Sequence, residues 1–94
     1  MKAELLQRDR YVFDDGTILE MVIWRVPKPV RGSQHSYKYR LFFGYPGNRI
    51  VGYDNERPKG DHRHLEGSEA IYRFINVEIL VRDFLADVAR WRSK

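Results

Sequence analysis

Asp15 and Gly16 constrain the fold of this chain more than any other neighbouring pair of residues. They separate two apolar segments, YVF and TILEMVIWRV. Glycine readily adopts the positive φ that two-residue hairpin turns require, so this pattern predicts an antiparallel hairpin. The second arm, residues 17–26, carries apolar side chains on both faces: Ile18, Val22 and Trp24 on one, and Leu19, Met21 and Ile23 on the other. This arrangement predicts a central strand that is covered on both sides.

Two prolines and a glycine in residues 27–36 predict a loop, after which strand patterns resume. Residues 36–45 alternate in polarity, residues 46–48 predict a turn, and residues 49–53 predict a short partner strand. Residues 70–75 could form one more strand. One row of side chains in the alternating segment could stack on nucleic-acid bases, but we expect it to face the core: Tyr37, Tyr39, Leu41, Phe43 and Tyr45.

The C-terminal segment predicts a helix that begins after the N-cap residue Asn76. Its apolar residues recur at helical spacing, namely Val77, Leu80, Val81, Phe84, Leu85, Val88 and Trp91. Its polar face is expected to contain Arg82, Asp83, Asp87 and Arg90. We expect Trp24 and Trp91 in the core. The fold class is therefore predicted as α+β, a small antiparallel β-sheet with a C-terminal amphipathic helix packed on one face.

The charge of the chain is concentrated in its middle. The net charge is +4, and residues 27–64 hold eight basic residues against three acidic ones. Such an excess suits a phosphate backbone, although many basic proteins bind nothing anionic. The 94 residues suffice for a single domain, residues 1–94. The chain has no cysteine, no export signal and no apolar run of roughly 20 residues, so we expect a cytoplasmic protein without a membrane partner.

Residues 53–64, YDNERPKGDHRH, are too polar for a core and hold two of the three histidines. If the backbone around His62 and His64 is extended, both rings project from one face, with their Cα atoms roughly 6–7 Å apart. One neutral imidazole could take a proton from a ribose 2′-hydroxyl, and a protonated one could give a proton to the departing 5′-oxygen. Histidine suits both roles because its unperturbed pKa is about 6.5.

Several neighbours of the two histidines are candidates for supporting roles. Lys59, which we place with the histidines in the catalytic set, could offset charge in the transition state. Arg57 and Arg63 are candidates for phosphate contacts, and Arg31 and Tyr53 for further contacts with nucleic acid. Asp54 or Asp61 could orient an imidazole by accepting its second N–H. Alternation along an extended backbone would place Lys59, Asp61 and Arg63 opposite the histidines unless Gly60 or a bend redirects them. His35 is expected to be a solvated loop residue.

Chemistry alone leaves three interpretations of this stretch open. The first is the ribonuclease site described above, which needs neither a cofactor nor a metal. The second is a metal-dependent nuclease, because a His-x-His pair near Asp54, Glu56 and Asp61 offers nitrogen and oxygen ligands. The third is a basic surface loop of a binding module that docks nucleic acid or an acidic partner without catalysis.

The same residues resemble those of a known family. YDNERPKGDHRH is followed by a Tyr-x-Phe segment at Tyr72 to Phe74 and by Asp83-Phe84 in the helix. This pattern resembles the TumE-type toxins, which are small bacterial proteins encoded beside a helix-turn-helix antitoxin. The resemblance runs from the DDGT hairpin to the final helix and is sharpest at KGDHRH. It implies a type II toxin that stops growth through RNA cleavage and is neutralised by the helix-turn-helix protein.

Overall fold

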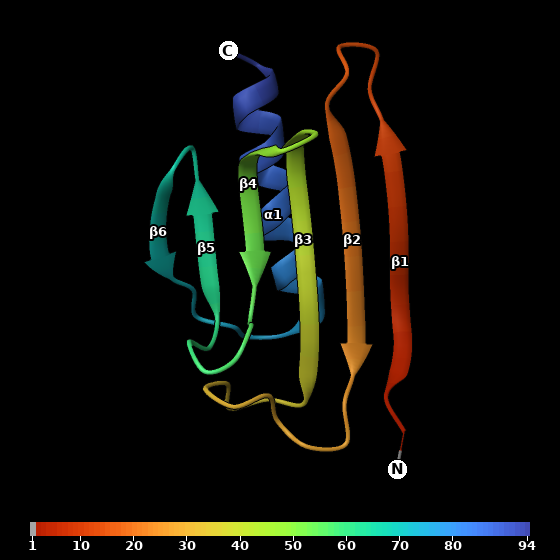
Figure 1. The fold of residues 1–94 in the computed structure, drawn as a ribbon, viewed down its shortest axis with the longest axis vertical. Coiled ribbons are helices and arrows are strands. Elements are labelled where there is room, and N and C mark those ends of the chain that lie inside the picture. The colour runs from red at the N-terminus through yellow and green to blue at the C-terminus, as the bar shows by residue number, and fades with distance from the viewer. Residues whose placement is uncertain (1) are drawn as a thin grey trace.

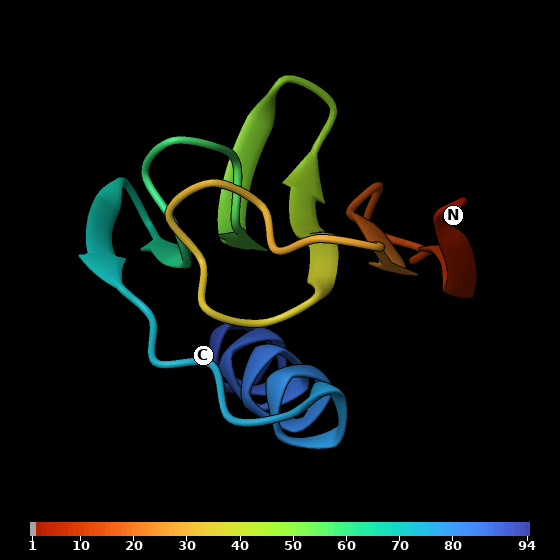
Figure 2. The ribbon, with the colours of Figure 1, turned by 90° about the horizontal axis from the view of Figure 1, so that it is seen from below.

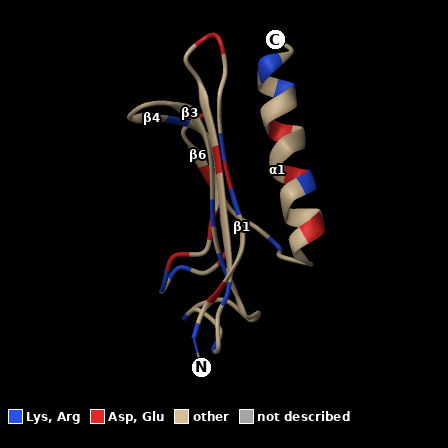
Figure 3. Ribbon diagram, turned by 90° about the vertical axis from the view of Figure 1, so that its right-hand side faces the viewer, with Lys and Arg blue, Asp and Glu red and all other residues tan. Residues whose placement is uncertain are grey.

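The computed structural model describes residues 2–94 as one antiparallel sheet and one helix (Figure 1). The six strands pair in chain order, so that each lies beside its neighbours in the sequence. The helix lies across one face of the sheet and leaves the other face without a helix (Figure 3). The predicted α+β class is confirmed. The elements are β1 Glu4–Val12, β2 Ile18–Arg25, β3 Tyr37–Tyr45, β4 Asn48–Asp54, β5 His62–Leu65, β6 Ser68–Ile71 and α1 Val77–Arg92.

The Asp15-Gly16 turn joins β1 and β2 as predicted. Gly16 has a φ of 88°, and the Asp15 carboxylate accepts hydrogen bonds from the backbone N–H and the hydroxyl of Thr17, at 2.9 and 2.6 Å. These bonds lower the pKa of Asp15. An Asp side chain that caps its own turn fixes the chain reversal and with it the register of the hairpin.

The face of β2 away from the helix is less covered than its sequence indicates. Leu19, Met21 and Ile23 are buried on the helix side, but Trp24 is only half-buried and lies outside the core cluster. The expectation that Trp24 belongs to the core is therefore wrong. We call the surface of the sheet turned away from α1 the open face.

The core lies between α1 and the middle strands. Leu80, Phe84 and Val88 of the helix join buried side chains of β2, β3 and β4, and Trp91 packs edge-on against Phe43 with ring centroids 5.4 Å apart. Asn76 caps the helix as predicted, because its side chain accepts the backbone N–H of Ile79 at 2.8 Å. Within the predicted tyrosine row, the central members Tyr39, Leu41 and Phe43 are buried.

Asp87 is the main departure from the predicted helix. It was expected on the polar face, but it is only 2% exposed and lies under the sheet. Its carboxylate accepts the Tyr53 hydroxyl at 2.6 Å and two bonds from the Arg63 guanidinium at 2.9 Å each. Burial raises the pKa of Asp87, but the bonds from Tyr53, Arg63 and Arg90 outweigh burial and leave the pKa below its usual value. This group ties β4 and β5 to the helix.

Two loops meet at the end of the sheet that carries the charged stretch (Figure 2). Residues 26–36 connect β2 to β3, and residues 55–61 connect β4 to β5. Gly32 and Gly60 touch there, since a Cβ atom on Gly60 would lie 2.5 Å from the Gly32 carbonyl oxygen, and both glycines have positive φ. Asn55 connects the β4–β5 loop to β3, because its side chain accepts from the Tyr39 N–H and donates to the Tyr37 carbonyl.

Candidate active site

The two histidines of the charged stretch lie on β5, on the open face. Their strand forms a tight hairpin with β6 through Glu66 and Gly67, whose φ values of 47° and 89° are those of a type I′ turn. The extended backbone sends His62 and His64 to the same side, as predicted, and places Glu69 directly opposite His64. Both imidazoles are half-buried, with side chains 13% and 16% exposed.

A hollow of about 400 Å³ opens in front of the two imidazoles. Strands β3, β4, β5 and β6 contribute its floor, and the β4–β5 loop forms one wall. Ten residues line it, namely Arg40, Arg49, Asp54, Glu56, Arg57, Pro58, Lys59, His62, His64 and Glu69. The hollow therefore combines two imidazoles with four cations and three carboxylates.

The contacts of His62 define its tautomer. Its Nδ1 lies 2.8 Å from the carbonyl oxygen of Gly60, and a carbonyl can only accept. His62 therefore donates from Nδ1, and its neutral form carries the free lone pair on Nε2. This atom lies 3.6 Å from Oε1 of Glu69. An imidazole held this way presents a proton acceptor to the hollow.

His64 is held in the opposite tautomer. Its Nδ1 lies 2.9 Å from Nη2 of Arg49, and a guanidinium can only donate. His64 therefore accepts at Nδ1 and carries its proton on Nε2, which lies 3.8 Å from Oδ2 of Asp54. Gly52 makes this contact possible, because a Cβ atom there would lie 2.5 Å from Cδ of Arg49. The missing side chain leaves a path for Arg49 across the sheet.

Glu69 links the two imidazoles. One carboxylate oxygen lies 3.6 Å from Nε2 of His62, and the other lies 3.6 Å from Nδ1 of His64. The Lys59 ammonium lies 3.8 Å from the same carboxylate. Glu69 therefore joins both imidazoles and Lys59 in one charged cluster.

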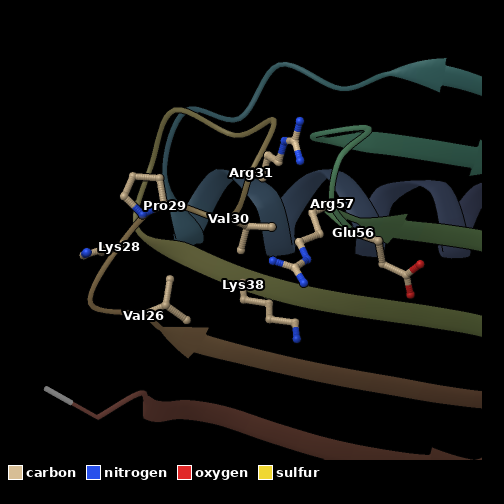
Figure 4. Close-up of a pocket in the computed structure, with 8 residues that line it drawn as sticks. All are labelled: Val26, Lys28, Pro29, Val30, Arg31, Lys38, Glu56 and Arg57. Atoms are coloured by element: carbon tan, nitrogen blue, oxygen red, sulfur yellow. The ribbon is translucent and has the colours of Figure 1, made fainter.

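The structure brings together five of the nine residues proposed for this site. Lys59 turns toward the histidines although simple alternation predicts the opposite side, because Gly60 redirects the chain with a φ of 82°. Arg57 and Asp54 line the same hollow. Arg31 lies in an adjoining hollow of about 560 Å³, where Val30, Lys38 and Arg57 converge (Figure 4).

Arg63 and Tyr53 face the helix instead. The Arg63 guanidinium is bound to Asp87, and Tyr53 is only 2% exposed, so neither reaches the open face. Burial and the bond to Asp87 also raise the pKa of Tyr53 well above a tyrosine's usual range, which keeps its hydroxyl a donor. In the structure these two side chains hold β4 and β5 on the helix, on the side of the sheet opposite the histidines.

Asp61 orients a different histidine from the two that were proposed. Its carboxylate contacts Nε2 of His35 at 2.7 Å and accepts from the hydroxyls of Tyr39 and Ser33 at 2.6 Å each. The His35 ring also stacks on Phe74 with centroids 3.7 Å apart. His35 is therefore held in place by Asp61 and Phe74, and the expectation of a solvated side chain is wrong.

Sequence reasoning missed three residues of the hollow, Arg40, Arg49 and Glu69. The signal for Glu69 was present, because Glu66-Gly67 four residues after the first histidine is a hairpin turn and register then places Glu69 beside His64. Arg40 follows from the alternation of β3, which turns it away from the core. Arg49 depends on the irregular register between Phe43 and Gly44, which no pattern in the sequence indicates.

Two further findings concern metals and membranes. Within residues 2–94, no group of three or more histidine, aspartate or glutamate side chains is arranged to hold a metal ion. The single helix among these residues is too short and too polar to cross a bilayer.

Comparison with known proteins agrees with the motif. No significant match was found among curated proteins or among solved structures. A family model described as Toxin TumE matches residues 2–92, which is nearly the whole chain and includes the open face with both histidines. The chain therefore belongs to the TumE toxin family, which gives it the role of a toxin and implies an antitoxin partner.

Proposed function

We propose that this toxin is a ribonuclease that cleaves RNA by histidine acid–base chemistry. The observation that carries the proposal is the pair of imidazoles in one hollow, which are held in opposite tautomers by Gly60 and Arg49. RNA contains its own nucleophile, the 2′-hydroxyl, so the protein needs only a base, an acid and charge stabilisation.

His62 is the proposed base. Its Nε2 lone pair accepts the proton of the 2′-hydroxyl, and the 2′-oxygen attacks the adjacent phosphorus. The bond from Nδ1 to the Gly60 carbonyl supports this role, because it orients the ring and stabilises the positive charge that the ring acquires. The bond between phosphorus and the 5′-oxygen then breaks, which leaves a 2′,3′-cyclic phosphate.

His64 is the proposed acid, which protonates the departing 5′-oxygen. It must first gain a proton, and the Arg49 guanidinium at Nδ1 opposes this. A phosphate in the hollow would compete for Arg49, since a guanidinium pairs bidentately with phosphate oxygens. Once Arg49 turns to the phosphate, Nδ1 of His64 is free to take up this proton, with Oε2 of Glu69 3.6 Å away to accept the new N–H.

Lys59, Arg57 and Arg40 supply the remaining positive charge. Lys59 lies near the imidazoles, and Arg57 lies in both the histidine hollow and the adjoining one that contains Arg31. These cations would hold the phosphates beside the scissile bond and offset the charge that develops in the transition state. The toxin would act as a single domain in the cytoplasm, and a helix-turn-helix antitoxin would neutralise it.

The proposal is tested with purified toxin and a defined RNA strand. Cleavage is expected to persist in EDTA, and the matching DNA strand and a 2′-O-methyl strand are expected to resist because they lack the nucleophile. Activity that disappears in EDTA and returns with Mg²⁺ or Mn²⁺ would support the metal-dependent alternative. RNA that is bound but never cleaved would support the binding module.

RNA affinity is expected to fall steeply as the salt concentration rises, because the Lys and Arg side chains of the toxin displace counterions from the phosphates. Replacing Lys59 or Arg31 with alanine should make the slope of log Kd against log salt shallower by roughly 0.7–1. Arg82→Ala on the helix is the control, since Arg82 is exposed on the other side of the molecule. A slope that stays the same in Lys59→Ala and Arg31→Ala would show that neither residue contacts phosphate.

A further inference from the structure

A third hollow on the open face has no assigned role. It measures about 290 Å³ and adjoins both the histidine hollow and the loop hollow of Figure 4. It shares Arg40 and Glu56 with the histidine hollow, and it shares Lys38 and Glu56 with the loop hollow. The open face therefore carries one continuous depression. The third hollow is lined by Val22, Trp24, Lys38, Tyr39, Arg40, Asn55 and Glu56.

Trp24 is the unusual member of this group. Tryptophan is the largest side chain, and this one lies half-buried on the open face instead of in the core. Its direct cross-strand neighbour is Lys38, and the next pair along β2 and β3 joins Val22 to Arg40. An aromatic plane with two cations on the neighbouring strand β3 matches the two parts of a nucleotide, which are a flat base and an anionic phosphate.

The polar groups beside Trp24 restrict how a base could be recognised. The Asn55 side chain is buried and bonded within the protein, because it accepts from Tyr39 and donates to Tyr37 and Ser33. The Tyr39 hydroxyl is bound to Asp61. Neither can read a base edge, so recognition here would rest on stacking, which every base permits.

The position of Trp24 relative to the histidines fits a strand that crosses the sheet. Cross-strand pairing places Val22, Arg40, Asp54 and His62 in one row across β2 to β5, and Trp24 lies two residues from that row. Strand spacings of ~4.8 Å put Trp24 roughly 16 Å from His62. The cationic side chains between Trp24 and His62 would contact the phosphates of the bound RNA strand.

We propose that Trp24 is a stacking platform for a nucleobase and that the toxin therefore takes single-stranded RNA, bound across the open face. This inference rests on the proposed ribonuclease function and adds the class of substrate. In a duplex the bases are stacked on one another and cannot lie on the indole. The platform predicts a preference for unpaired RNA with little dependence on the base at this position.

The test uses the fact that the chain has only two tryptophans. In Trp91→Phe, the emission of the protein comes from Trp24 alone; in Trp24→Phe, it comes from Trp91, which packs against Phe43. The probe is a single-stranded 2′-O-methyl oligonucleotide, which binds without being cleaved. We expect it to quench Trp91→Phe but not Trp24→Phe, and its blunt duplex to quench neither.

Affinity gives a second readout. Trp24→Ala is expected to raise Kd for the single strand roughly 5–150-fold, the range for loss of one stacked base, while Arg82→Ala leaves it unchanged. Protein that binds and cleaves RNA without quenching of Trp24 would overturn the platform but not the ribonuclease. Absence of both binding and cleavage would overturn both. Quenching by purified antitoxin and not by RNA would make this surface a protein interface.

Discussion

Replacing His62 or His64 with asparagine is expected to lower RNA cleavage by roughly 10²–10⁴-fold, the usual contribution of a general acid or base. Asparagine is chosen because its amide can reproduce the contact made by Nδ1. The amide N–H can donate to the Gly60 carbonyl in place of His62, and the amide oxygen can accept from Arg49 in place of His64. Each variant thus loses Nε2 but retains its fixed partner.

The same changes are expected to relieve growth arrest when the toxin is expressed. The fold reduction in RNA cleavage should be far smaller in the double variant than the product of the two single reductions, because the groups act in one reaction. The control is Arg82→Ala, which should remain toxic. His35→Ala is not a neutral control, since it would break the contacts with Asp61 and Phe74. Folded His62 and His64 variants that stay fully toxic would rule out the catalytic pair.

Asp87→Asn is expected to lower the free energy of unfolding by about 3 kcal/mol, because it leaves the Arg63 guanidinium against the helix without its carboxylate. For a chain of this size, the corresponding fall in Tm is roughly 12–24 °C. Asp14→Asn, in the exposed β1–β2 turn, is the matched control and should change stability by less than about 0.5 kcal/mol.

The stabilisation from Asp87 also has a defined pH dependence. The folded pKa of Asp87 is lower than that of an unfolded carboxyl, which is about 3.9. Its contribution is therefore fully present above pH ~4 and is lost as the pH falls through the folded pKa. Thermal melts between pH 3 and 7 should show a shallower acid limb in Asp87→Asn than in the unchanged protein. An equally steep limb in both would mean that Asp87 is not the titrating group.

Asp87 connects the fold to the site. Arg63 lies between His62 and His64 on β5, with its side chain on the other face of the sheet. Its pairing with Asp87 fixes β5 on the helix and thus holds the backbone that presents both imidazoles. This explains why a short strand of four residues, next to the edge strand β6, can carry chemistry that needs exact placement.

Most of the fold could be predicted because its strands are joined by turns with clear chemistry. Asp15-Gly16 and Pro46-Gly47-Asn48 mark two chain reversals, and Asn76 marks the start of the helix. The face of β2 that carries Trp24 was not predictable in the same way. Both faces of this strand are apolar, so alternation separates them without indicating which one the helix covers.

The segment that holds the site could be predicted, but the arrangement of its side chains in space could not. The spacing of His62 and His64 placed both rings on one face and Arg63 on the other. Asp87 shows how residue type can mislead, since it follows Phe84 by three residues and precedes Trp91 by four, which is the core side of the helix. Its partners Tyr53 and Arg63 are distant in sequence, so the buried contact appears only in three dimensions.

The most direct test of the central claim is the chemical nature of the RNA ends that purified toxin produces in the presence of EDTA. Attack by the 2′-hydroxyl, with His62 and His64 as base and acid, predicts a 2′,3′-cyclic phosphate on one fragment and a 5′-hydroxyl on the other. Fragments that carry a 3′-hydroxyl and a 5′-phosphate would show that water is the nucleophile, which would contradict this account.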